Sequence, residues 1–227
     1  MASYNKSWLI PTVLLAVLFG ACNETNSTKE KVADVVAEKK EPVFDSLLIT
    51  DSSWGFIRAD MNFSDLKVLY GEANLTDERI CGPECVDSLD VTTLYPGTIN
   101  ETIIYWKEKA WHKTIAMIMC YQDSALFHTD KGLKMKSGLS ELLRLNGQKI
   151  SFSGFGWDYG GTITSYNSGR LEKSALHYEL DISINPVEEE LSLFGDTALD
   201  TDMLLVKQLL PSIYIRKFTL VLNNHEY

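Results

Sequence analysis

The chain has 227 residues, of which 45% are hydrophobic and 23% charged, and its formal net charge is −10 at pH 7. This acidic balance argues against nucleic acid as a partner and against electrostatic attachment to anionic lipid surfaces, because both carry negative charge. A chain of this length and apolar content can bury one good core, as a single domain or as two small fused repeats.

Residues 1–21 have the pattern of an export signal. Lys6 supplies a positive start, Leu9 to Phe19 supply an apolar stretch too short for a stable membrane span, and Gly20 and Ala21 are the small residues a signal peptidase requires. Cys22 follows at once, and the stretch LFGAC resembles the lipobox of bacterial lipoproteins. That resemblance implies a diacylated Cys22 as the new N-terminus. An ordinary signal peptide with a chance cysteine is the alternative.

Residues 22–45 are mostly polar and charged, with one short apolar run at 32–37. This composition predicts a tether that lifts a domain off the membrane. Each buried CH₂ of an acyl chain contributes about 0.8 kcal/mol, so two or three chains anchor the protein without a transmembrane helix. We therefore expect a location in the bacterial cell envelope, at the outer membrane. The sequence leaves open whether the domain faces the periplasm or the outside.

Three further cysteines fit an exported chain. In the stretch ICGPEC, the Gly82-Pro83 turn would bring Cys81 and Cys85 together, and an oxidising compartment favours a disulfide between them. The CGPEC spacing has one residue more than the CGPC of thioredoxins and lacks a βαβ context, which argues against a redox role. Cys120 alternates with apolar neighbours in TIAMIMCY and is predicted to be a buried strand residue.

A copper(I) site is a further alternative for the soft side chains of the chain. Thiolate and thioether ligands favour Cu(I). Their spacing does not define a site, and we expect neither a metal nor another cofactor. The side chains in question are Cys81, Cys85, His112, Met117, Met119 and His128.

Two short segments of similar sequence indicate an internal repeat. The stretches SDLKVLYGE at 64–72 and SELLRLNGQ at 140–148 share Ser, an acid, Leu and Gly at matching positions. Their apolar residues recur at helical spacing, and Gly71 and Gly147 lie where a helix would end. Each repeat is therefore predicted to begin with a short helix.

Strand-like patterns follow each predicted helix. Residues 101–108 and 113–122 are predicted to form one hairpin, and residues 162–167 and 176–183 a second one around the turn Asn167-Ser168-Gly169. A third helix over 200–210 should end at Pro211 and lead into a last strand over 213–222.

The predicted fold class is α+β, with two tandem helix-plus-antiparallel-sheet repeats and a C-terminal helix and strand. The domain is expected over 46–222, with repeats at about 55–125 and 132–185 and the helix-strand ending over 196–222.

The repeat and the lipobox together resemble, in layout, the beta-lactamase inhibitor protein and the small outer-membrane assembly lipoproteins of the SmpA type. The stretch LNGQKISFSGFGWDYGG, with LFGD and the helix-Pro-strand ending, resembles a family of uncharacterised exported bacterial proteins. These resemblances imply binding to another envelope protein more readily than catalysis.

The stretch GFGWDYGG at 154–161 holds four of the fourteen glycines of the chain. Glycine clusters mark tight bends, bulges or close approach of another backbone. One interpretation is structural, with Trp157 filling the core and a turn shaped by Gly154, Gly156, Gly160 and Gly161. The other is a partner-facing patch formed by Trp157, Asp158 and Tyr159, because binding hot spots use aromatic anchors. Under either interpretation, some rings of this region should be buried and some exposed.

Enzyme motifs are weak in this sequence. The glycine spacing at 154–160 is followed by a strand pattern, whereas a dinucleotide fingerprint requires a helix. Asp158, Asp181 and His177 could act as acid, base and nucleophile helpers, but the nearby Ser151 and Ser153 lack a nucleophile elbow, so no catalytic residue is expected. We expect a membrane-anchored protein-binding or assembly module. The alternatives are a small-ligand-binding or sensing lipoprotein and an enzyme that uses Asp158.

Overall fold

A computed structural model describes residues 45–82, 88–108 and 112–223. The described residues all belong to one compact unit, Pro42–Tyr227. This unit has its own hydrophobic core, so we expect it to fold without residues 1–41. The predicted export signal, Cys22 and nearly all of the predicted tether lie outside the described residues. Within the described ranges, no helix is long and apolar enough to cross a membrane.

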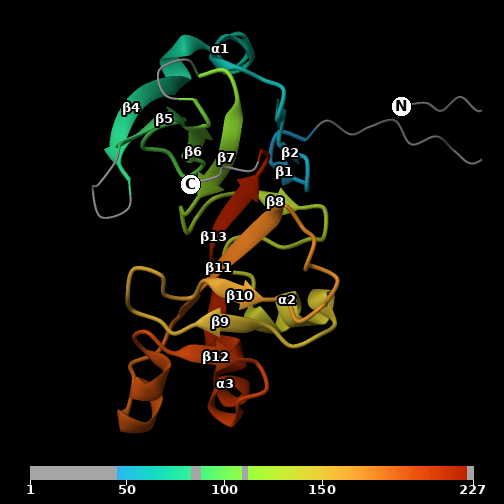
Figure 1. Cartoon of the computed structure of the whole chain (residues 1–227), viewed down its shortest axis with the longest axis vertical. Coiled ribbons are helices and arrows are strands. Elements are labelled where there is room, and N and C mark those ends of the chain that lie inside the picture. Colours follow the sequence, from blue (N-terminus) through green and yellow to red (C-terminus); the bar gives the residue numbers. More distant parts are fainter. Residues whose placement is uncertain (1–44, 83–87, 109–111, 224–227) are drawn as a thin grey trace, which may run out of the picture. The chain divides into compact units, whose positions relative to one another are not determined.

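The fold class is α+β, as the sequence predicts. Its main element is a six-stranded sheet in the order β11-β13-β7-β6-β5-β4, with every neighbouring pair antiparallel (Figure 1). The strands are β4 (Leu75–Cys81), β5 (Ser88–Leu94), β6 (Thr102–Trp106), β7 (Ile115–Cys120), β11 (Leu176–Ile182) and β13 (Ile213–Val221).

The other strands of the described residues form two smaller sheets. One has the order β3-β2-β1-β8, and the other has the order β10-β9-β12. Their strands are β1 (Leu48–Ile49), β2 (Ser53–Trp54), β3 (Ile57–Arg58), β8 (His128–Thr129), β9 (Ser151–Ser153), β10 (Ile163–Ser165) and β12 (Ala198–Asp200). Short 3-10 helices lie at η1 (Glu72–Asn74), η3 (Glu188–Leu193) and η4 (Leu210–Ser212).

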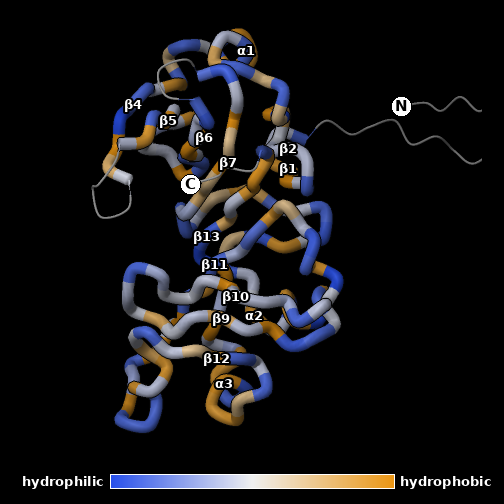
Figure 2. Tube along the Cα trace, in the orientation of Figure 1, coloured by the Kyte–Doolittle hydropathy of each residue, from blue (hydrophilic) through white to orange (hydrophobic). Residues whose placement is uncertain are grey.

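The two helices of the proposed repeat are present as α1 (Phe63–Tyr70) and α2 (Leu139–Asn146). Asn62 caps α1 by accepting hydrogen bonds from the first-turn amides, and Gly147 ends α2 in the left-handed conformation. The third helix, α3 (Leu204–Leu209), begins later than predicted because the preceding residues form β12. Figure 2 shows α3 as a hydrophobic segment.

The strands of the second repeat correct the prediction. The hairpin expected between 101–108 and 113–122 is confirmed by the pairing of β6 with β7. The hairpin expected between 162–167 and 176–183 is wrong, because β10 pairs with β9 while β11 pairs with β13. The long strand β13 pairs with β11 along the whole length of β11. By contrast, β10 is short, and the isolated bridge to β11 is formed by Thr162, one residue before β10. The repeat layout is therefore not confirmed.

Burial explains why β5 is one of the strands that were not predicted from the sequence. Residues 91–94 of β5 are all buried, so this strand has no alternation of polar and apolar faces.

Cys120 is buried in β7 with a free thiol, as predicted. Burial raises the pKa of the Cys120 thiol to about 11.

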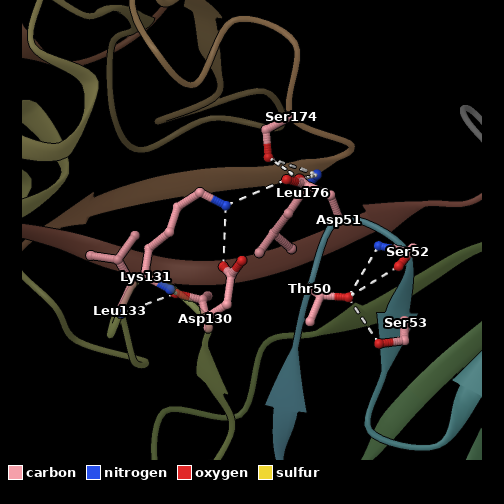
Figure 3. A network of polar contacts seen from close by, with 10 residues as sticks. Thr50, Asp51, Ser52, Ser53, Asp130, Lys131, Leu133, Ser174 and Leu176 are labelled. Atoms are coloured by element: carbon pink, nitrogen blue, oxygen red, sulfur yellow. Dashed lines mark hydrogen bonds and ion pairs between the residues drawn. The ribbon is translucent and has the colours of Figure 1, made fainter. Parts of the chain in front are cut away.

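The Asp51 carboxylate connects three segments that are distant in the sequence (Figure 3). Asp51, in the turn between β1 and β2, accepts hydrogen bonds from the Ser174 hydroxyl and from the Leu176 amide at the start of β11. Its second oxygen lies 3.4 Å from Lys131 Nζ, which also contacts Asp130 at 3.1 Å. Partial burial would raise the pKa of Asp51, but the Ser174 hydrogen bond and the Lys131 charge outweigh it and lower that pKa.

Candidate functional site

The aromatic loop, residues 154–161, joins β9 to β10 and is hydrogen-bonded to neighbouring backbone at both ends. At its start, the Gly154 amide donates to the Thr197 carbonyl and the Phe155 amide donates to the Leu193 carbonyl, both at 2.8 Å. At its end, the Gly161 carbonyl accepts from the Leu180 amide of β11 at 2.9 Å. The loop is thus tied to η3 on one side and to the main sheet on the other.

The glycines of the aromatic loop allow this close packing. A Cβ atom at Gly161 would lie 1.8 Å from the Leu180 carbonyl oxygen, and the Gly161 φ of +73° is already unfavourable for other residues. A Cβ atom at Gly154 would lie 2.4 Å from the Thr197 side chain. Gly160 and Gly156 approach the Trp157 carbonyl and the Phe194 ring, respectively. Their role is therefore close approach of other groups, which fixes the path of the loop.

The rings of this region divide into buried and exposed ones, as expected. Phe152 and Phe155 are fully buried, with ring centroids 5.7 Å apart. Trp157 is half-buried and donates from Nε1 to the Gly154 carbonyl at 2.9 Å. Tyr159 is 58% exposed and packs edge-to-face on Trp157 at 5.4 Å. Phe155 therefore takes the core position that one interpretation assigned to Trp157.

The start of the aromatic loop contacts an acidic and apolar segment. Phe155 forms a bridge to Phe194, directly after η3, and their rings are 6.3 Å apart. The first turn of η3 carries the exposed acids Glu188 and Glu189, and Val187 and Leu191 are exposed apolar residues there. Asp158, which lies between Trp157 and Tyr159 in the sequence, is exposed. Apolar and negative groups thus occur together in this part of the domain.

A charged cluster supports the other end of the aromatic loop. Glu179 in β11 is buried and forms ion pairs with Arg216 and Lys217 of β13. The irregularity in strand pairing between Glu179 and Leu180 brings these two adjacent cations to one carboxylate. Arg216 also donates to the Gly160 carbonyl at 3.5 Å. These groups line a cavity of about 380 Å³ on the sheet, together with Asp181.

The residues considered for catalysis are not brought together into one described cavity. Asp181 accepts a hydrogen bond from the Tyr214 hydroxyl at 3.4 Å and lines the cavity of the charged cluster. His177 is exposed on β11. Asp158 lies on the exposed part of the aromatic loop and does not line that cavity. Among the described residues, Asp158 and Asp181 therefore do not share this cavity.

The side chains of the copper alternative have separate surroundings. His112 stacks on Trp106 at 5.1 Å and lies 3.5 Å from Asp77, whereas His128 lies 3.2 Å from Asp45. Over the ranges that the structure describes, no three His, Cys, Asp or Glu residues form a group that could hold a metal ion. Cys85 lies outside the described residues, so the Cys81–Cys85 disulfide stays a prediction.

Sequence reasoning missed the charged cluster. A signal for it exists in IYIRKFTL, where the adjacent Arg216 and Lys217 interrupt the alternation of apolar and polar residues along the last strand. An interruption of this kind is typical of a strand irregularity. The carboxylate partner Glu179 was not predictable, because β11 was assigned to a different pairing.

Comparisons with known proteins add no functional assignment. No family model and no curated protein matches this chain. The crystal structure of the uncharacterized protein yfeY from Escherichia coli is similar, with 11% identity and a TM-score of 0.42. The match covers 76% of this chain and 98% of that one. A likeness at this level carries no argument about function.

Proposed function

We propose that this protein is a lipid-anchored, protein-binding module of the bacterial cell envelope and that the aromatic loop is its contact surface. The observation that carries the proposal is the exposed Tyr159 ring, stacked edge-to-face on Trp157 at 5.4 Å. The loop backbone beneath these rings is held by η3 and β11. Rigid aromatic anchors lose little conformational entropy on binding and dominate many interfaces.

The charges near the aromatic loop suggest the chemistry of the partner. Asp158, Glu188 and Glu189 are exposed acids, and the whole chain carries a net charge of −10. A protein surface with an apolar pocket for the Tyr159 ring and a basic rim would complement them. Such a rim mainly speeds association, and salt weakens its effect. Nucleic acid remains disfavoured as a partner because it repels the same charges.

The lipid anchor is supported by the lipobox-like stretch ending at Cys22. If Cys22 is acylated, Cys22→Ser should move the protein out of the membrane fraction or leave it uncleaved, because the acyl chains hold it there. Fractionation followed by intact-mass measurement checks this prediction. An unmodified Cys22 with unchanged fractionation contradicts it.

The contact surface can be tested by photo-crosslinking in the native envelope. A photoreactive amino acid at Asp158, between Trp157 and Tyr159 in the sequence, should give one discrete protein adduct. The matched control carries the same amino acid at Tyr121, which is also an exposed position, beyond the end of β7. An adduct at 158 whose yield falls with added salt, and none of the same mass at 121, supports the proposal. Equal adducts at both positions, or none at 158, contradict it.

A further inference from the structure

A cavity of about 740 Å³, which we call the basic groove, is bordered by α2, by α3 and by the turn after β10. Ser140 and Arg144 of α2 line it together with the capping Gly147, and this i, i+4, i+7 spacing places them on one side of the helix. Lys207 of α3 and Asn167 of the turn line it as well. The volume lies in the range of small-molecule sites.

The charged side chains around the basic groove are mostly positive, although the chain as a whole carries a net charge of −10. Arg144, Lys149 and Lys207 line it, and Asp202 is the single acid among the described lining residues. All three cations are exposed, so a ligand can reach them without movement of the backbone. This local excess of positive charge attracts an anionic ligand to the groove.

The three cations differ in how far their charge is already used. Lys149 Nζ lies 3.2 Å from Asp200, and Lys207 Nζ lies 3.1 Å from Asp202. Among the described residues, no carboxylate pairs with Arg144. A guanidinium carries five N–H donors in a planar fork that matches the oxygens of a phosphate or carboxylate. Arg144 is therefore the group best suited to bind the anion directly.

The backbone that carries Arg144 is fixed by a neighbouring segment. The Arg170 guanidinium donates to the Arg144 carbonyl at 3.1 Å, which brings a further cation to the end of α2. Asn146 is 1% exposed, donates to the Tyr166 carbonyl at 2.9 Å and accepts from the Leu171 amide at 3.2 Å. Because these contacts exist without a ligand, binding would require little ordering of the backbone.

The turn after β10 has an unusual conformation beside the groove. Asn167 and Ser168 have φ values of +50° and +59°, which are uncommon for residues other than glycine. Asn167 Nδ2 donates to the Ser151 hydroxyl at 3.1 Å, and the Ser168 amide donates to the Glu172 carboxylate at 3.2 Å. These bonds hold the turn in its conformation. Residues held in this way are concentrated at ligand sites.

Uncharged polar side chains make up much of the remaining lining. Hydroxyl and amide groups both donate and accept hydrogen bonds, so they suit the hydroxyl groups of a ligand. The side chains of this kind belong to Ser140, Gln148, Asn167 and Thr201. A ligand that combines an anionic group with hydroxyl groups would therefore match the lining.

We infer that the basic groove binds a phosphate ester of a hydroxyl-bearing small molecule, and that Arg144 binds the phosphate oxygens. A phosphate monoester carries nearly two negative charges and three acceptor oxygens, so it uses several cations where a carboxylate uses fewer. A free sugar phosphate and the glycerol phosphate headgroup of a lipid share this chemistry. The groove shares no lining residue with the aromatic loop, so the inference does not depend on the proposed protein-binding function.

Two arms of one experiment distinguish these sources. Both use residues 22–227 with Cys22→Ser, which keeps the mature chain but prevents an acyl anchor from contributing. In phosphate-free buffer, titration calorimetry should show saturable binding of glucose 6-phosphate, at least about ten-fold tighter than that of glucose. In the second arm, flotation compares vesicles of phosphatidylglycerol with vesicles of zwitterionic phosphatidylcholine. Binding of the sugar phosphate alone assigns a free ester, and selective binding to phosphatidylglycerol assigns a lipid headgroup.

Arg144→Gln should weaken the binding of whichever probe binds by at least about ten-fold, because it removes charge-assisted hydrogen bonds. Arg58→Gln is the matched control, since it makes the same change of charge at an exposed arginine of β3 that does not line the groove. It should alter binding by less than about two-fold. Asp202→Asn removes the acid from the lining and should strengthen binding about two- to five-fold.

Three results would overturn the inference. The first is that glucose 6-phosphate binds no more tightly than glucose while the two kinds of vesicle bind equally or not at all. The second is an equal loss of binding in Arg144→Gln and Arg58→Gln, because the charge of the whole chain and not the groove would then be responsible. The third is weaker binding in Asp202→Asn.

Discussion

Two regions of the domain are rich in aromatic side chains: the aromatic loop, and the aromatic cavity of about 360 Å³ that is lined by Trp54, Tyr70, Tyr95 and Phe127. They place their rings differently. In the loop, Trp157 and Tyr159 lie on the outer side of a backbone that packs tightly against η3 and β11. In the cavity, Trp54 and Phe127 are buried and leave space between the elements that carry them. In the loop, glycines such as Gly154 and Gly161 allow the backbone to lie directly against its neighbours.

This comparison shows that ring composition does not by itself identify a binding surface. Under the proposed function, the exposed Tyr159 ring, which packs on the half-buried Trp157, inserts into the surface of a protein partner. The rings around the aromatic cavity instead line a space within the domain.

Gly161→Ala should have the largest effect, because the new Cβ would lie 1.8 Å from the Leu180 carbonyl oxygen at a φ of +73°. We expect a loss of more than about 3 kcal/mol in the free energy of unfolding, measured by urea denaturation. Gly132→Ala is the matched control, with a φ of +85° but nothing within 4 Å of the added Cβ. It should cost only about 1 kcal/mol. Equal losses would contradict the close packing of the loop.

Trp157→Ala should have an intermediate effect, because this side chain is half-buried and makes one hydrogen bond to Gly154. We expect a loss of roughly 1–2 kcal/mol, compared with about 3–5 kcal/mol for Phe155→Ala, which removes a fully buried ring from the same loop. Thermal unfolding of the two variants measures the contrast. If Trp157→Ala and Phe155→Ala lose equal free energy of unfolding, Trp157 is a core residue, which contradicts this prediction.

Asp51→Asn should have a smaller effect on stability than Trp157→Ala, since ion pairs of partly exposed groups contribute about 1 kcal/mol or less. The pKa of Asp51 is lowered by folding, so its contribution is present above the unfolded pKa and is lost as the pH falls through the folded one. The difference between variant and unaltered protein should therefore be measurable at about pH 7 and vanish toward about pH 2.

A double-mutant cycle with Ser174→Ala isolates this contact, because the Ser174 hydroxyl donates to Asp51. The two substitutions should show coupling at neutral pH. A difference that grows on acidification would contradict the assigned direction of the pKa shift.

Local patterns were sufficient to predict several elements of this fold. The helical spacing and terminal glycines located α1 and α2, and the alternation in TIAMIMCY located β7 with its buried Cys120. The partner of β11 was not predictable, because pairing with β13 depends on contacts between residues far apart in the sequence. The same limit applies to β5, whose five consecutive buried residues give no period-two signal.

For the sites, the sequence identified the aromatic loop but not which of its rings are buried. Which rings are buried depends on the close contacts of Gly154 with Thr197 and of Gly161 with Leu180, and both partners are distant in the sequence. The aromatic cavity left no local signal at all, since Trp54, Tyr70, Tyr95 and Phe127 belong to four separate segments. Only the folded chain brings them together.

The most direct test of the account combines the crosslinker at Asp158 with removal of the neighbouring ring. Tyr159→Ala removes an exposed side chain, so the free energy of unfolding should change by less than about 0.5 kcal/mol. If the ring contacts a partner, the yield of the adduct at 158 should fall at least about ten-fold, while Tyr121→Ala leaves it unchanged. An adduct that persists undiminished in Tyr159→Ala, with the protein still folded, would contradict the claim that the aromatic loop is the contact surface.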